Sequence, residues 1–347
     1  MGPVDGKGRE QRAPAQIGAS AASAGGLPWL VGDIGGTNAR FGLVTDPAHP
    51  AQHVRTLPVA QHAGPGAAVR SYLAELANEG VANVQLQRAA LAMATPITSD
   101  LVEMTNSHWR FSRAALQADL GLQSLAVLND FEALALSLPR LGPLQLRPHG
   151  LPLNPHGTMA VIGPGTGLGV AGVVQTPGGW VALPGEGGHA TLSAGDDFEA
   201  QLLAHVRQTH HHVSAERLLS GIGLPTLHQA VAAVLGQAAP QLSAQDIVER
   251  GRAGTDALCG TTLDTFCDLL GGFAGNVALT LGARGGVYIG GGIVPRLGER
   301  FFTSRFRERF ESKGRFRTYL EAIPTALITD TLVALTGAAV AIEQAAG

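Results

Sequence analysis

The chain has 347 residues, a formal net charge of −3 and a sequence pI near 6.5. Apolar residues make up 45% and charged residues 15%, which indicates a globular chain long enough for two domains. This charge balance predicts neither a nucleic-acid partner nor attachment to an anionic membrane, and no apolar stretch is long enough to span a bilayer.

Two scarce residue types narrow the chemistry. Only two cysteines occur, Cys259 and Cys267, so no disulfide framework is expected and a cytoplasmic location fits. The only lysines are Lys7 and Lys313, and neither stands in a G-K-[ST] context. A P-loop nucleotide site and Schiff-base chemistry, which both need a lysine, are therefore disfavoured.

The N-terminal segment 1–28 is rich in Ala, Gly, Ser and Gln and shows no apolar periodicity. It lacks the apolar central run of a secretory signal. We expect a disordered extension. An organellar transit peptide is the alternative, which Asp5 and Glu10 weaken.

The stretch LVGDIGGTNARFGLV at 30–44 predicts two strands joined by a glycine turn, Leu30–Asp33 and Phe41–Val44. A Rossmann fingerprint requires a helix after the glycines, and here a second strand follows. MAVIGPGTGLGVAGVV at 159–174 repeats the pattern, with strands Met159–Ile162 and Val170–Val174. Two such units, each with a threonine in its turn, suggest two similar halves facing each other.

Both turns offer successive backbone N–H groups and a hydroxyl, which together form an anion-binding concavity. Two of them facing one cleft would hold a polyphosphate from both sides. Asp33 would repel phosphate directly, so we expect it to face Mg²⁺, through water. The alternative is that both units are ordinary tight hairpins.

The segment LQSLAVLNDFEALALSLPRL at 122–141 predicts a strand, Leu125–Leu128, and a helix, Phe131–Leu138, which Pro139 ends. Asp130 stands between them, at a helix N-terminus that stabilises negative charge. A carboxylate there is placed to accept a proton from a substrate hydroxyl. A simple Asn129–Asp130 helix cap is the alternative.

Glycines in LPGEGGHATLS at 183–193 allow Glu186 and His189 to converge on one small ligand. With Asn129 they offer donors and acceptors suited to a polyol, and a metal pair is the competing interpretation. Glu216 is expected in the first turn of a helix that begins at Ser214 or Thr209, where it would complement the helix dipole.

Two further patterns lie near the C-terminus. GGVYIGGGIVPR at 285–296 predicts a strand, Val287–Ile289, and glycines that let a flat ring lie on the backbone, unless they only form a strand-to-helix turn. Phenylalanines at 302, 306 and 310 predict the apolar face of one helix, whose solvent face carries Arg305, Arg307 and Arg309.

These segments, taken in series, resemble bacterial glucokinases of the type distinct from the ROK group. The resemblance runs from about Trp29 to near the C-terminus and rests on seven motifs. They are GDIGGTNAR (32–40), PITSDLVEMTNSHW (96–109), LNDFEA (128–133), GPGTGLGVA (163–171), PGEGGH (184–189), ERLLSG (216–221) and GGVYIGGGIVPR (285–296). The cysteine-rich zinc motif of ROK kinases is absent, and no helix-turn-helix pattern precedes Trp29.

The resemblance implies the two-domain α/β fold of actin-like ATPases and hexokinases, related to ribonuclease H, with a cleft between the domains. It implies a small domain at 29–140 plus about 331–347 and a large domain at 141–330. The implied reaction is phosphorylation of glucose at its 6-hydroxyl by ATP with Mg²⁺, in a homodimer.

The matching motifs imply that Asp130 is the base and also contacts the sugar. The residues implied to hold the sugar with it are Asn129, Glu186, His189 and Glu216. The residues implied to hold the nucleotide are Asp33, Gly35, Gly36, Thr37, Asn38, Gly165, Thr166, Gly167, Gly291 and Gly292. Two alternatives stay open, a kinase for mannose or fructose and a non-catalytic sugar sensor.

Overall fold

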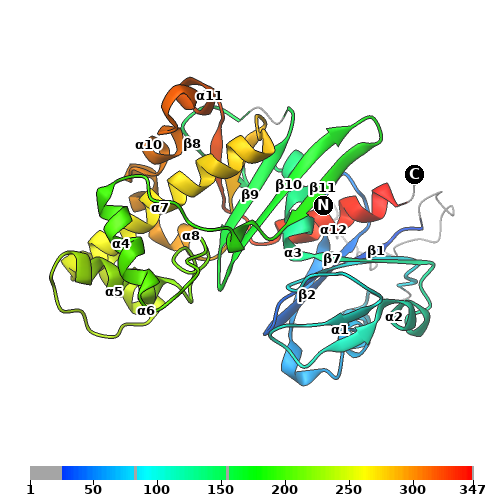
Figure 1. Ribbon diagram of the computed structural model, residues 1–347. Coiled ribbons are helices and arrows are strands. Elements are labelled where there is room, and N and C mark those ends of the chain that lie inside the picture. Colours follow the sequence, from blue (N-terminus) through cyan, green and yellow to red (C-terminus); the bar gives the residue numbers. More distant parts are fainter. Residues whose placement is uncertain (1–25, 82–83, 154–155, 346–347) are drawn as a thin grey trace, which may run out of the picture.

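The computed structural model describes residues 26–81, 84–153 and 156–345. Two β-sheets, each with helices packed against it, form two lobes that meet along helices α3 (Asp130–Ser137) and α12 (Val333–Gln344) (Figure 1). This is the α/β architecture expected from the sequence. The expected disordered extension lies, up to residue 25, outside the described residues.

The first sheet has five strands in the order β3-β2-β1-β4-β7. They are β1 (Trp29–Ile34), β2 (Asn38–Val44), β3 (Gln52–Pro58), β4 (Arg88–Met93) and β7 (Ser124–Asn129). Strands β1, β4 and β7 run parallel, so their carboxyl ends share one edge of the sheet. The other elements of this lobe are α1 (Pro65–Asn78), β5 (Leu101–Glu103), β6 (Arg110–Ser112) and α2 (Arg113–Asp119).

The second sheet has six strands in the order β11-β10-β9-β12-β13-β8. They are β8 (Leu146–His149), β9 (Met159–Pro164), β10 (Leu168–Thr176), β11 (Gly179–Gly185), β12 (Gly286–Ile289) and β13 (Thr325–Ile328). The helices of this lobe lie on the side away from the first sheet (Figure 1). They are α4 (Asp197–Arg207), α5 (Leu224–Val234), α6 (Ala244–Ala253), α7 (Ala257–Leu281), α8 (Val294–Leu297), α9 (Glu299–Thr303), α10 (Phe306–Glu311) and α11 (Arg317–Glu321).

Both predicted glycine hairpins are confirmed. Strands β1 and β2 pair antiparallel from Trp29–Val44 to Ile34–Ala39, which leaves residues 35–37 in the turn. Strands β9 and β10 pair antiparallel up to Pro164–Leu168, which leaves residues 165–167 in the turn.

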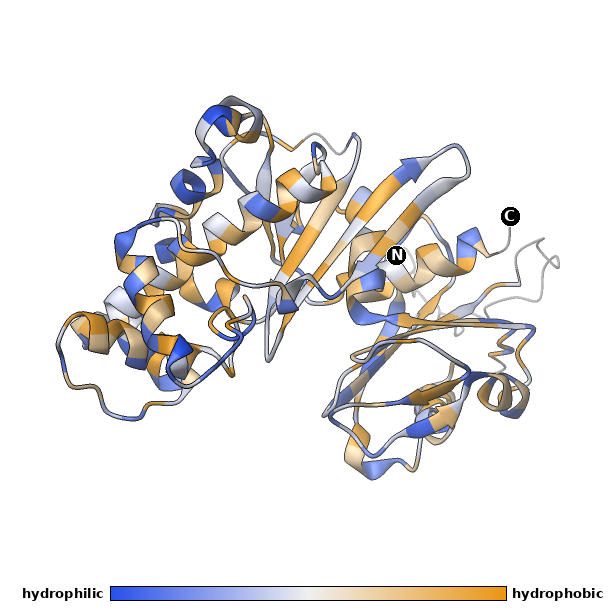
Figure 2. Cartoon of the chain, viewed as in Figure 1, coloured by the Kyte–Doolittle hydropathy of each residue, from blue (hydrophilic) through white to orange (hydrophobic). Residues whose placement is uncertain are grey.

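The lobes share a continuous apolar core. One cluster of buried side chains takes Val161 from β9, Ala135 from α3, Val340 from α12 and Ala90 from β4. Figure 2 shows hydrophobic residues concentrated along these central strands and helices. The two helices therefore connect the lobes through buried apolar contacts as well as through the chain itself.

Helices α3 and α12 approach each other closely at one glycine. A Cβ atom added at Gly337 of α12 would lie 1.7 Å from the carbonyl oxygen of Ala133 on α3. No side chain fits at this distance, so glycine is required where the two backbones cross.

The predicted helix through the three phenylalanines is wrong. The chain breaks at Ser304 between α9 and α10. Only Arg305 is largely exposed, whereas Arg309 is buried in ion pairs with Glu199 and Asp196. Both free cysteines are buried, and no described helix is long and apolar enough to cross a membrane.

We predict that Gly337→Ala destabilises the protein by roughly 1–3 kcal/mol, the usual cost of inserting a methyl group into a tight contact. The control is Gly272→Ala on α7, where an added Cβ meets no atom within 4 Å. This control is expected to leave stability unchanged or raise it slightly, because alanine is the better helix former. Urea denaturation of the three proteins measures the difference, and equal midpoints would contradict the tight crossing.

Candidate functional site

The first hairpin presents its turn at the carboxyl edge of the first sheet. The backbone N–H of Gly35 donates to the carbonyl of Asn38 over 2.9 Å and closes the turn, while Thr37 and Asn38 are exposed. A Cβ at Gly36 would lie 2.5 Å from the carbonyl oxygen of Asn106. The loop that contains Asn106 therefore packs closely against the turn. The turn keeps an open face for a ligand.

The second hairpin closes in the same way. Gly165 N–H donates to Gly167 O over 2.9 Å, and Thr166 is exposed between them. Gly165 O in turn accepts the N–H of Gly221 over 2.7 Å. A neighbouring loop thus holds the turn in position.

Asp130 lies where β7 ends and α3 begins. Asn129 caps the helix, because its Oδ1 accepts the N–H of Phe131 over 2.9 Å while its Nδ2 donates to the carbonyl of Thr95 over 3.2 Å. Asp130 Oδ1 also accepts the Phe131 N–H over 2.9 Å. The helix cap that was the alternative interpretation is therefore present. It orients the Asp130 carboxylate and does not exclude a role for it as a base.

Two carboxylates lie together at this edge. Burial raises the pKa of Asp130 to about 6, the Phe131 N–H opposes that rise, and the negative charge of Asp33 adds to it. Burial also raises the pKa of Asp33, against the effect of Arg40, whose Nη1 is 3.5 Å from Asp33 Oδ2. The mutual effect follows from the topology, because β1 and β7 end at the same edge.

The ring of Phe131 joins Asp130 to the second hairpin. A Cβ atom at Gly169 would lie 2.0 Å from Phe131 Cε2, and one at Gly163 would lie 2.3 Å from Phe131 Cζ. The ring therefore lies on bare backbone of β9 and β10. Phe131 was not predicted as a site residue, although the glycines at 163 and 169 and the aromatic residue next to Asp130 were the available signal.

Three of the expected sugar ligands lie close together. His189 Nε2 is 3.9 Å from Glu186 Oε2, and His189 Nδ1 is 3.8 Å from Glu216 Oε1. The other oxygen of Glu216 accepts the N–H of Leu168 over 2.8 Å. Glu216 thus links this cluster to the second hairpin.

The expected position of Glu216 in a first helical turn is wrong. The N–H of Glu216 donates to Gly188 O and that of Ala215 donates to Ala190 O, so this segment pairs with a neighbouring loop. The next helix, α5, begins only at Leu224.

The third glycine segment follows β12 and lies on the second hairpin. Gly291 has a φ of +75°, and a Cβ there would lie 2.4 Å from the carbonyl oxygen of Pro164. Gly292 is exposed, and a Cβ there would meet nothing within 4 Å. An open, side-chain-free backbone is therefore present beside the turn at 165–167.

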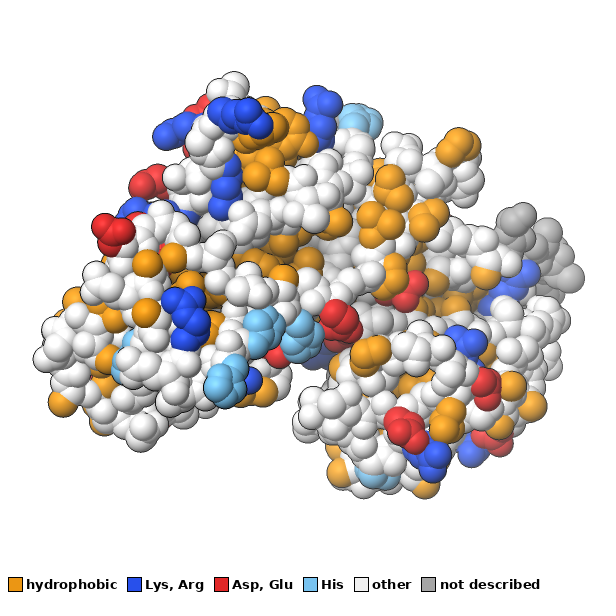
Figure 3. Space-filling view, in the orientation of Figure 1, with side chains coloured by type: hydrophobic (Ala, Val, Ile, Leu, Met, Phe, Trp, Pro, Cys, Tyr) orange, Lys and Arg blue, Asp and Glu red, His pale blue; other side chains and the backbone are white. Residues whose placement is uncertain are grey.

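The surface is hollowed between the lobes, and histidine and acidic side chains gather at the top of the hollow (Figure 3). Among the described residues, no group of three or more His, Cys, Asp or Glu side chains is arranged to hold a metal ion.

Comparison with known proteins finds a match to the family model described as Glucokinase over residues 30–345. A relative from Aromatoleum aromaticum named glucokinase is 49% identical over 319 residues, which cover 92% of this chain and 95% of the relative. The crystal structure of a glucokinase from an Antarctic psychrotroph superimposes with a TM-score of 0.84 at 39% identity, covering 91% of this chain and 98% of that one.

A more distant solved structure shares the fold. It is a ROK family glucokinase from Streptomyces griseus in complex with glucose and AMPPNP, with a TM-score of 0.59 and 18% identity, covering 90% of this chain and 98% of that one. The expected sugar-kinase fold is thereby confirmed.

We predict that Asp130→Asn raises the free energy of unfolding at pH 7 by roughly 1–3 kcal/mol. A carboxyl group whose pKa is raised on folding, here from 3.8 to about 6, lowers stability as the pH rises through that window. The stability gained by Asp130→Asn over the wild type should therefore be largest above pH 6 and shrink as the pH falls towards 4.

Urea denaturation at several pH values measures this effect. The matched control is Asp46→Asn, because hydrogen bonds lower the pKa of that exposed carboxyl group and its removal should bring no gain. A stability difference between wild type and Asp130→Asn that does not vary with pH would contradict the raised pKa.

Proposed function

The chain belongs to the glucokinase family, and on this premise we propose that it transfers the γ-phosphoryl group of ATP to the 6-hydroxyl of glucose. The observation that carries the proposal is the position of Asp130, at the end of β7 and tied through Phe131 to a glycine hairpin. Neither a kinase for another hexose nor a non-catalytic sensor is favoured by a specific observation.

Asp130 is suited to act as the general base. Its pKa of about 6 leaves the carboxylate ionised at neutral pH and brings its basicity nearer to the working range than that of an ordinary aspartate. We propose that it accepts the proton of the sugar hydroxyl as the oxygen bonds to phosphorus.

The two turns would hold the polyphosphate. The chain contributes Gly35, Gly36, Thr37 and Asn38 from one side and Gly165, Thr166 and Gly167 from the other. Their N–H and hydroxyl groups suit phosphate oxygens. We place the adenosine along Gly291 and Gly292, where the backbone carries no side chain.

Glu186, His189 and Glu216 would hold the sugar together with Asn129. The His189 ring lies within 4 Å of both glutamates, so these groups can share one small polyol. Since Glu216 also accepts the Leu168 N–H, the sugar and phosphate sites are connected by a single side chain.

Asp33 fits Mg²⁺ held through water, because it is a half-buried carboxylate beside a second carboxylate, so a cation there would relieve the repulsion between them. A bound Mg²⁺ would neutralise charge on the transferring phosphate. Asp33 and Asp130 would then both be stabilised in their ionised forms.

We infer further that 29–140 plus about 331–347 form the small domain and 141–330 the large one. The packing of α12 on β1, β4 and β7 supports the return of the chain to the small domain.

A homodimer in the cytoplasm is also proposed, with the free cysteines consistent with a reducing compartment. Light scattering of the purified protein tests the dimer.

A coupled assay of the purified protein with several sugars and phosphoryl donors tests the function itself. Glucose with ATP should give the highest kcat/KM. Preference for mannose or fructose would identify another hexose kinase, and tight glucose binding without turnover would identify a sensor.

We predict that Asp130→Asn lowers kcat by about 10²–10⁴-fold while the Kd for glucose changes little, since proton acceptance matters in the transition state and the amide keeps the hydrogen-bonding shape. Glu216→Gln is the comparison, because it should weaken glucose binding more than it lowers kcat. Calorimetry and steady-state kinetics separate the two quantities. Equal losses of rate and affinity in Asp130→Asn would make Asp130 a sugar ligand only.

We predict that kcat/KM for glucose falls as the pH drops through about 6, where Asp130 becomes protonated in the free enzyme. Asp33→Asn should move this midpoint to lower pH, because it removes the negative charge that raises the pKa of Asp130. The pH–rate profiles of both proteins measure the midpoints. An unmoved or higher midpoint in Asp33→Asn would show that the two carboxylates do not interact.

A further inference from the structure

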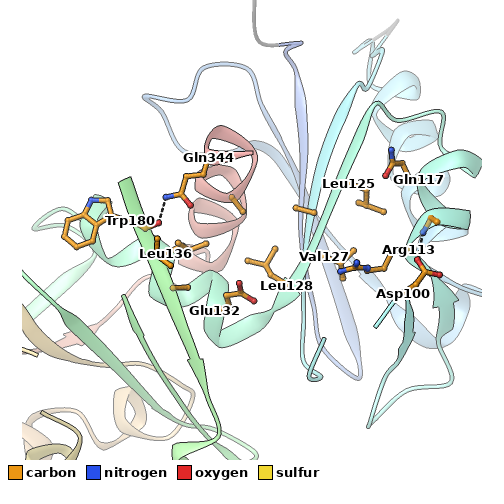
Figure 4. A pocket seen from close by; sticks show the side chains of 15 residues that line it. Asp100, Arg113, Gln117, Leu125, Val127, Leu128, Glu132, Leu136, Trp180 and Gln344 are labelled. Carbon is orange, nitrogen blue, oxygen red and sulfur yellow. Dashed lines mark hydrogen bonds between the residues drawn. The ribbon is translucent and has the colours of Figure 1, made fainter. Parts of the chain in front are cut away.

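A cavity lies between the lobes, beside strands β7 and β11. Its volume is about 500 Å³, within the usual range for ligand pockets. Its walls come from α2 and β7 on one side, from α3 and α12, and from β11 on the other side (Figure 4). Asp130 is not among the residues that line it, so we call it the edge groove to distinguish it from the site above.

The edge groove is bounded by main chain on two sides. Four consecutive residues, Leu125–Leu128, line it from β7, and three consecutive residues, Trp180–Ala182, line it from β11. Alternate side chains of a strand point to opposite faces, so a cavity that touches consecutive residues must lie at the edge of the strand. Strands β7 and β11 are indeed the terminal strands of their sheets.

Two sheet edges thus face one space. Terminal strands carry backbone N–H and C=O groups that can pair with an added strand. Four residues of β7 span about 13 Å, which is room for a short extended peptide. Apolar side chains on both sides of the groove, among them Leu128, Leu136 and Trp180, offer contacts for alternate side chains of such a peptide.

One buried polar atom in the edge groove lacks a hydrogen-bond partner. Arg113 Nε is buried without a hydrogen-bond acceptor. The positive charge of Arg113 helps to lower the pKa of the Asp100 carboxyl, but the guanidinium forms no hydrogen bond or ion pair within 4.0 Å with any residue the structure describes. Figure 4 shows the Arg113 side chain reaching towards Val127. A guanidinium group without a bonded acceptor is suited to bind a carboxylate through two parallel N–H···O hydrogen bonds.

The acidic residues of the groove are already engaged. The carboxylate of Asp100 accepts Ser112 Oγ–H and Ala114 N–H at the start of α2. Burial raises the pKa of Glu132, and the nearby backbone N–H of Asn129 opposes that rise. Neither forms a close ion pair with Arg113 among the described residues, so an external carboxylate can occupy that position.

We propose that the edge groove docks an extended segment of a partner protein, which pairs with the β7 edge and places a carboxylate side chain on Arg113. The backbone pairing supplies affinity for any extended chain, and Arg113 supplies the preference for an acidic residue. The proposal does not depend on the reaction catalysed at Asp130.

The test uses the full-length protein and a defined probe, the peptide acetyl-Val-Thr-Glu-Val-Thr-amide. Trp29 and Trp109 are buried, with 4% and 1% exposure, whereas Trp180 lines the groove, so tryptophan fluorescence reports binding there. Saturable binding is expected at a Kd below about 1 mM, a value typical of weak docking. The signal should disappear in Trp180→Phe.

Changes in the peptide and at Arg113 test the predicted contacts. N-methylation of alternate amides of the peptide removes strand pairing and should abolish binding to the wild-type protein. Arg113→Glu should weaken binding by about tenfold or more, and a peptide with lysine in place of glutamate should restore it. Arg113→Lys, which keeps the charge but cannot form the bidentate contact, should lose part of the affinity and bind more tightly than Arg113→Glu. Unchanged glucose phosphorylation serves as the control that these variants are folded.

Three results would overturn the proposal. They are the absence of a saturable signal with the wild-type protein, binding that is indifferent to N-methylation, and binding equally strong in Arg113→Glu. If light scattering instead shows self-association that Arg113→Glu abolishes, the occupant is a second copy of the chain and the proposed partner segment is wrong.

Discussion

The contact of the Phe131 ring with bare backbone at Gly163 and Gly169 is the constraint on which the site depends. It determines how far the first turn of α3, and with it Asp130, stands from the second hairpin. Gly188 and Gly291 also lie against bare backbone. A Cβ at Gly188 would collide with the carbonyl oxygen of Leu168, and one at Gly291 with that of Pro164. Close approach of backbones, rather than interlocking side chains, thus brings the second glycine turn, Asp130 and the proposed sugar ligands into one region.

The carboxyl edge of the first sheet concentrates negative charge at a cost in stability. Asp33 and Asp130 lie at the ends of parallel strands, and burial raises the pKa of both. Two such carboxylates reduce the stability of the empty protein. On the proposed function, a bound cation and a substrate hydroxyl group would offset that cost, so the same electrostatics would favour the substrate-bound state.

Much of the site could be predicted from local sequence. The two hairpins, the strand before Asp130 and the helix after it were all predicted correctly, since glycine turns and helix caps depend on neighbouring residues. Glu216 was misplaced because its segment bonds to Gly188 and the 165–167 turn, which are remote in sequence. The edge groove was not foreseen for the same reason, since it forms between residues near 127 and 181. Arg309 is buried by ion pairs with residues more than a hundred positions away, which helical periodicity cannot reveal.

The kinetics of Gly169→Ala test the central claim most directly. The added methyl group would lie 2.0 Å from the Phe131 ring, so the ring and the start of α3 must move. The account predicts a kcat lowered by about a hundredfold, the scale of a misplacement near 1 Å, with a folded protein and nearly unchanged glucose affinity. Phe131→Leu in the same chain should restore part of the rate. A wild-type kcat in Gly169→Ala would show that Phe131 does not position Asp130.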